Sequence, residues 1–106
     1  MAREIVVTIP HALTRQDAIG RVRGGIDQLL KLVGGRVKVE QSEWFNDSVH
    51  LSMRVVGQSF AVTIAVDDKF VTITGKIPLM LSAFANPARQ FVERHGALLL
   101  QKPGGR

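Results

Sequence analysis

Hydrophobic and polar residues alternate with a period of two over the middle of the chain, which is the pattern of β-strands that bury one face. A β-branched run near the start predicts one further strand. The predicted strands cover residues 4–9, 37–45, 49–55, 60–66 and 70–74. The short connections Asn46-Asp47-Ser48 and Asp67-Asp68-Lys69 favour antiparallel neighbours.

Helical spacing replaces this alternation in two segments. The first follows Thr14, whose position three residues before Asp17 predicts a helix N-cap, and its apolar residues are Ala18, Val22, Ile26, Leu29 and Val33. The second begins near Asn86-Pro87, and its apolar stripe is Phe91, Val92, His95, Leu98 and Leu99. Phe91 and Leu98 are expected to be core residues, and Gly96 is expected to interrupt this helix.

Together these elements predict an α+β fold in the order β-α-β-β-β-β-α. An antiparallel sheet of about five strands would bury one apolar face, and the two helices would cover it as a second layer. At 106 residues the chain is expected to form a single domain over residues 1–102. Residues 103–106 lack packing side chains and are expected to be a disordered tail.

The first helix contains Gly20, Gly24 and Gly25, although glycine costs about 1 kcal/mol relative to alanine inside a helix. We interpret these glycines as sites where the helix backbone approaches the sheet closely. The alternative is a helix that is soft so that it can move.

Composition narrows the classes of protein. A hydrophobic content of 45% with 22% charged residues is ordinary for a soluble domain. No apolar run approaches the ~20 residues that span a bilayer. The start of the sequence lacks the pattern of a secretory signal, and the chain has no cysteine for a disulfide or a thiolate metal site. We therefore expect a cytoplasmic protein.

Residues with catalytic or ligand-binding potential are few. His11, His50 and His95 are far apart and match no metal-ligand spacing. No serine stands in a GxSxG context, and no glycine pattern matches a phosphate-binding loop. The sequence therefore predicts a protein that is not an enzyme, with no catalytic, cofactor-binding or metal-binding residue.

Two apolar features remain as candidate sites. The space between the sheet and the last helix could hold an apolar ligand, although a filled core is the expected state because protein interiors are close-packed. The second feature is the apolar segment 79–85. Its residues Leu79, Met80, Leu81 and Phe84 would either close one end of the core or form an exposed interaction surface.

Several motifs carry a resemblance to a known family. They are Ile9-Pro10-His11-Ala12-Leu13 before the first helix, the central alternating strands, and Val71-Thr72-Ile73 continuing into Ile77-Pro78-Leu79-Met80-Leu81. Over about residues 3–101 the chain resembles the polyhydroxyalkanoic acid system proteins, small bacterial proteins often encoded beside polyhydroxyalkanoate granule genes. The element order also resembles a reduced helix-grip domain, in which a sheet wraps a C-terminal helix around an apolar cavity.

Three functions are therefore expected, in decreasing order of support. The resemblance implies a non-enzymatic accessory protein of polyhydroxyalkanoate metabolism that binds the granule surface or a granule-associated protein. The alternative is a module that binds a small apolar or acyl ligand between the sheet and the C-terminal helix. The third is weak nucleic-acid binding, which the net charge of +5 permits but the scattered basic residues do not favour.

Overall fold

The computed structural model describes residues 2–33, 37–55, 57–78, 83 and 85–101. The elements follow the predicted order, and their bounds are β1 (Ala2–Pro10), α1 (Arg15–Val33), β2 (Val37–Phe45), β3 (Ser48–Val55), β4 (Gln58–Val66), β5 (Phe70–Pro78) and α2 (Ala85–Leu99). The predicted α+β class is confirmed.

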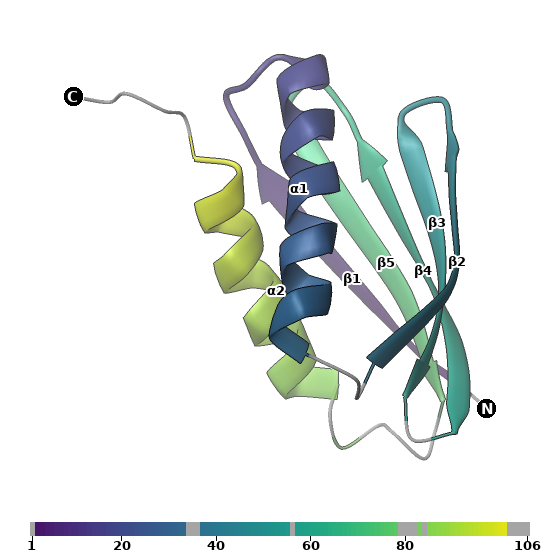
Figure 1. The fold of residues 1–106 in the computed structure, drawn as a ribbon. Helices are drawn as coiled ribbons and strands as arrows, with labels where there is room; N and C mark the ends of the chain where they lie inside the picture. The colour runs from purple at the N-terminus through teal and green to yellow at the C-terminus, as the bar shows by residue number, and fades with distance from the viewer. Residues whose placement is uncertain (1, 34–36, 56, 79–82, 84, 102–106) are drawn as a thin grey trace.

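The strands form one antiparallel sheet in the order β1-β5-β4-β3-β2. The first strand therefore pairs with the last, and β1 and β2 are the edges. Both helices lie on the same face of the sheet and run in opposite directions (Figure 1). The other face of the sheet carries no helix in this view. The fold is thus the two-layer arrangement that the alternating pattern predicted.

The hairpin between β2 and β3 follows from its turn residues. Only Asn46 and Asp47 separate the two strands, and Asn46 has a φ angle of 57°. Asparagine tolerates this left-handed conformation, which two-residue hairpin turns require. The turn predicted at this position is therefore confirmed.

The last strand is longer than predicted. The alternation indicated an end at Thr74, with residues 75–78 as a joint, but β5 continues to Pro78. These four residues pair with the start of β1, in the register Ile5↔Gly75 and Ala2↔Pro78. The partner strand, 70 residues earlier in the sequence, supplies the hydrogen bonds that local preference did not predict. As a result, Gly75 and Ile77 belong to the sheet.

Burial decreases from one end of the sheet to the other. Ile9, Val49, Val66 and Val71 are buried, and they lie where β1 ends and α1 begins. We call this the closed end. At the opposite end, where α1 and β5 finish and α2 starts, the inward side chains are only half-buried; they are Ile5, Met53, Val55, Phe60, Val62 and Ile77. We call this the open end.

The N-terminus of α1 is fixed at the closed end. The backbone N–H of Asp17 donates a hydrogen bond to Thr14 Oγ1 at 3.1 Å, which confirms the predicted cap. Arg15 contacts Asp47 Oδ2 at 2.8 Å and Asp68 Oδ1 at 2.9 Å. The hydrogen bonds to Asp47 and then to Asp68 raise the pKa of the Arg15 guanidinium above its usual value. Arg15 thus joins the helix start to the β2–β3 and β4–β5 turns.

Two more arginines of α1 bind neighbouring elements. Arg21 Nη1 donates hydrogen bonds to the carbonyl oxygens of Leu99 at 2.7 Å and Gln101 at 3.2 Å. A cation at these carbonyls also complements the negative end of the α2 dipole. The Arg23 guanidinium lies over the Trp44 ring, 4.7 Å from its centroid. Arg21 and Arg23 therefore connect α1 to the end of α2 and to β2 through intramolecular contacts.

Glycines permit two close approaches at the helices. A Cβ atom on Gly25 would clash with the Leu99 side chain of α2, and one on Gly96 would clash with Ile9 of β1. Gly96 lies within a continuous helix, so the predicted interruption is wrong. Gly20 and Gly24 face open space. The interpretation that the α1 glycines approach the sheet is therefore wrong for these two, and Gly25 approaches α2 instead.

The prediction that Leu98 is a core residue is also wrong, because its side chain is 61% exposed. Phe91 is half-buried and stacks on His95 with ring centroids 4.0 Å apart. Phe91, His95 and Leu98 form a stripe at the side of α2. The face that meets the sheet is one residue further round the helix, at Val92 and Gly96.

Replacing Gly24 by alanine should raise the free energy of unfolding by up to about 1 kcal/mol, because the helix gains propensity and nothing obstructs the added methyl group. Gly25→Ala is the matched comparison, since its methyl group must displace Leu99. Urea melts of both variants measure the difference. Equal stabilisation by the two substitutions would contradict the close approach of α1 and α2.

Substitutions at a buried residue and at an exposed residue should have different effects on the free energy of unfolding. Val49 is fully buried, so Val49→Ala should lower the free energy of unfolding by about 2 kcal/mol through lost burial and a new void. Leu98→Ala should change it by less than about 0.5 kcal/mol, as is usual for exposed positions. Thermal and urea melts give both values, and a larger loss from Leu98→Ala than from Val49→Ala would reverse the assignment.

Candidate ligand-binding cavity

A cavity of about 800 Å³ lies between the sheet and the two helices. Its volume falls within the range of roughly 300–1,000 Å³ typical of small-molecule sites. Among the residues that the structure describes, the core is therefore not filled as expected. The helices are held against the sheet at the closed end, and the described side chains of the open end do not fill the space that remains.

The alternation of the strands determines which side chains reach this cavity. Residues of one parity in β1, β3, β4 and β5 point toward the helices and line it, while their neighbours point to the other face. The lining side chains of the sheet are Ile5, Val7, Ile9, Val39, Leu51, Met53, Val55, Phe60, Val62, Ile64, Val71, Ile73 and Ile77. The sheet wall is thus composed of aliphatic, methionine and phenylalanine side chains.

Gly75 contributes to the size of the cavity. It points toward the cavity from the middle of the sheet, between β1 and β4. A Cβ atom at this position would meet Val62 Cγ2 at 3.6 Å, an ordinary contact distance. The backbone geometry therefore does not require glycine here, and glycine leaves space where a larger side chain would enter the cavity.

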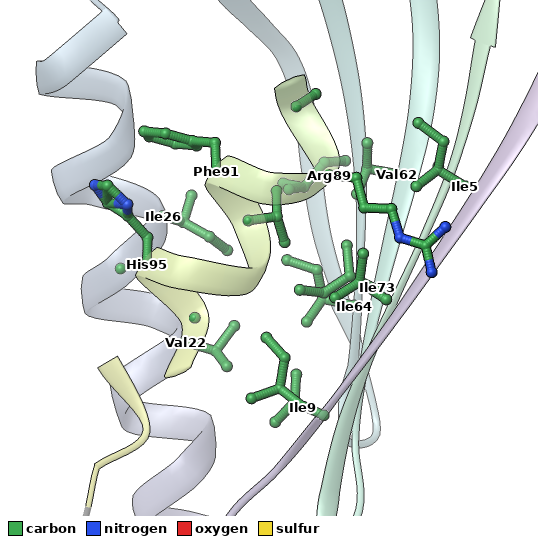
Figure 2. A pocket seen from close by; sticks show the side chains of 18 of the residues that line it. Ile5, Ile9, Val22, Ile26, Val62, Ile64, Ile73, Arg89, Phe91 and His95 are labelled. Carbon is green, nitrogen blue, oxygen red and sulfur yellow. The ribbon is translucent and has the colours of Figure 1, made fainter. Parts of the chain in front are cut away.

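The helices supply the other wall and the polar groups. Val22 and Ile26 of α1 and Val92 of α2 extend the apolar lining. Among the described lining residues, the polar side chains are those of Gln28, Arg89 and His95. Figure 2 shows Arg89 and His95 leaving α2 on different sides, with Arg89 directed toward the sheet.

The interior of the cavity is apolar. None of the side chains whose burial the structure describes is both buried and polar. Gln28, Arg89 and His95 are all exposed, so polar groups are confined to the rim. An occupant would meet only apolar contacts inside and polar contacts at the edge.

The candidate interaction surface from the sequence, Leu79, Met80, Leu81 and Phe84, lies outside the described residues. Its flanking residues Pro78 and Ala85 are placed at the open end of the sheet and the start of α2. The tail at residues 103–106 also lies outside the described part of the chain.

The histidines are not brought together. His11 Nε2 lies 2.8 Å from the carbonyl oxygen of Asp67, His50 Nδ1 lies 3.2 Å from Thr63 Oγ1, and His95 stacks on Phe91. Within residues 2–33, 37–55, 57–78, 83 and 85–101, no three His, Asp or Glu side chains form a group able to hold a metal ion. Neither α1 nor α2 is long and apolar enough to cross a membrane.

The sequence offered a space between the sheet and the last helix as a candidate site but did not identify the residues that form it. The available indications were Gly75 inside an alternating strand and the apolar parity of that strand continuing to Ile77. Both indications were missed because the strand was predicted to end at Thr74 and residues 75–78 were interpreted as a connection. Arg89 had no distinguishing sequence pattern, because Glu93 and Arg94 are further charged residues on the same helix.

Comparison of the chain with protein-family models, with curated proteins and with solved structures gives no match.

Proposed function

We propose that this protein binds a small, largely apolar molecule reversibly in the cavity between its sheet and its helices. The observation that carries this proposal is the cavity of about 800 Å³ with an apolar lining and polar groups only at its rim. Close-packed cores contain few voids larger than a water molecule, so a space of this size favours an occupant.

The shape of the lining favours a chain-like ligand. The cavity extends along the strands from buried Ile9 and Val71 at the closed end to half-buried Val55 and Ile77 at the open end. Moving apolar surface of a ligand from water into such a space is favourable by roughly 25 cal/mol per Å². An unbranched alkyl or acyl chain can lie along this direction, with its end among the buried residues of the closed end.

A binding role without catalysis is part of the proposal. The described residues at the cavity offer Gln28, Arg89 and His95 on the rim and no buried acid, base or nucleophile inside. Catalysis generally needs such a group positioned at the reacting atoms. The polar groups at this rim are suited to orienting a ligand.

A role at the polyhydroxyalkanoate granule stays a prediction that rests on the family resemblance. The residues that would carry it, Leu79, Met80, Leu81 and Phe84, lie outside the described part of the chain. Sedimentation of the protein with isolated granules, with Leu81→Ser and Phe84→Ser as variants, measures that role separately. Cytoplasmic localisation is a further expectation from the sequence.

A substitution that fills the cavity should abolish binding without unfolding the protein. Gly75→Leu has room for its Cβ next to Val62 and must place its remaining atoms in the cavity. We expect wild-type protein to bind 1-decanol at one saturable site, with a negative heat-capacity change from apolar burial. Gly75→Leu should bind it at least about tenfold more weakly, while its melting temperature is equal or higher.

Thr74→Leu is the matched control, because residue 74 points to the face of the sheet opposite Gly75. It adds the same side chain outside the cavity and should keep wild-type affinity. Isothermal titration calorimetry gives the affinities, and thermal melts give the stabilities. Undiminished decanol binding by a folded Gly75→Leu protein would exclude this cavity as the site, and absence of binding by the wild type would refute the proposed function.

A further inference from the structure

The rim of the cavity is not uniformly neutral. Arg89 is the one charged side chain among the described residues that line it. Its guanidinium extends from the N-terminal half of α2 toward the sheet side of the cavity (Figure 2). Its Nε atom lies 3.5 Å from Glu93 Oε2, and both side chains are about half exposed. This exposed ion pair is weak and leaves guanidinium donors free for another partner.

The helix itself adds positive potential at the same place. Arg89 directly follows the first turn of α2, and that turn, residues 85–88, contains no acidic residue to offset the positive end of the helix dipole. Ala88, on this turn, also lines the cavity. A single guanidinium beside an uncompensated helix start favours an anion at this part of the rim.

From this juxtaposition we propose that the natural ligand is a monocarboxylate with an unbranched apolar chain, oriented with its carboxylate on Arg89 and its chain directed toward the closed end. This inference rests on the proposed function, because it assigns the head group of the molecule held in the cavity. A planar guanidinium matches a carboxylate in a two-point hydrogen-bonded pair. One cation that is partly neutralised by Glu93 suits a single negative charge better than the double charge of a phosphate.

The distance along α2 from Arg89 to the closed end sets the expected length of the ligand's alkyl chain. Gly96 meets Ile9 where the cavity is closed, and it is seven residues beyond Arg89. At 1.5 Å per residue this distance along α2 is about 10 Å. An extended alkyl chain advances roughly 1.3 Å per methylene, given C–C bonds of about 1.5 Å, so roughly eight methylenes span it. Decanoate is therefore the appropriate probe.

The test compares decanoate with 1-decanol, which has the same chain and no charge. Isothermal titration calorimetry at neutral pH, below the micelle concentration, should show wild-type protein binding decanoate about tenfold or more tightly than decanol. Arg89→Gln should remove this preference, so that the variant binds decanoate no more tightly than it binds decanol. Glu93→Gln should increase the decanoate affinity, because it releases the guanidinium from its present partner.

Arg94→Gln is the matched control, because Arg94 is an exposed arginine of the same helix that does not line the cavity. It should retain the decanoate preference. Equal affinities of the wild type for decanoate and decanol, or a preference that survives Arg89→Gln, would overturn the head-group assignment while decanol binding still supports the cavity. Tighter binding of decyl phosphate than of decanoate would overturn the choice of a monocarboxylate. Failure of both decanol and decanoate to bind would instead refute the proposed function.

Discussion

The attachment of both helices to one end of the sheet determines where the two layers pack closely and where they leave space. Arg15 holds the start of α1 to the turns that carry Asp47 and Asp68, and Arg21 holds α1 to the last carbonyl groups of α2. Glycines at 25 and 96 let Leu99 and Ile9 pack directly against the helix backbones. The contacts of Arg15 and Gly96 lie at the closed end, and those of Arg21 and Gly25 join α1 to the last turn of α2. The helices therefore cover the closed end most tightly.

The cavity is the consequence of this uneven attachment. The inward side chains of the sheet continue with the same apolar parity past the region where the helices pack closely. The inward apolar residues of β5 run from Val71 to Ile77, a length of about 20 Å at roughly 3.3 Å per residue. The described side chains beside the open end leave this space unfilled, and β5 has glycine rather than a larger residue there, at Gly75. The polar groups are also distributed unevenly, because Arg89 lies at the rim of the cavity and apolar side chains line its interior.

The class of fold could be predicted from the sequence because it depends on local patterns of residues. Alternation assigned the strands, Thr14 assigned the start of α1, and Asn46 assigned the hairpin turn. What the sequence did not predict depends on contacts between distant residues. The pairing of β1 with residues 75–78 extended β5. The face of α2 that meets the sheet is about one residue further round than the predicted stripe, which leaves Leu98 exposed and places Gly96 against Ile9. The cavity exists because the side chains do not fill the volume between the two layers. The periodicity of the sequence gives no information on that volume.

Methyl NMR spectroscopy of the protein titrated with decanol shows directly whether the ligand lies between the sheet and the helices, because it locates the ligand by residue. If decanol binds there, shifts and intermolecular contacts are expected at Ile5, Ile73 and Ile77, which line the cavity. Val6, which is 45% exposed and points away from the cavity between two lining residues of β1, should be unaffected. Contacts at Val6 without contacts at Ile5 and Ile73 would place the ligand on the outer surface of the sheet and contradict the account.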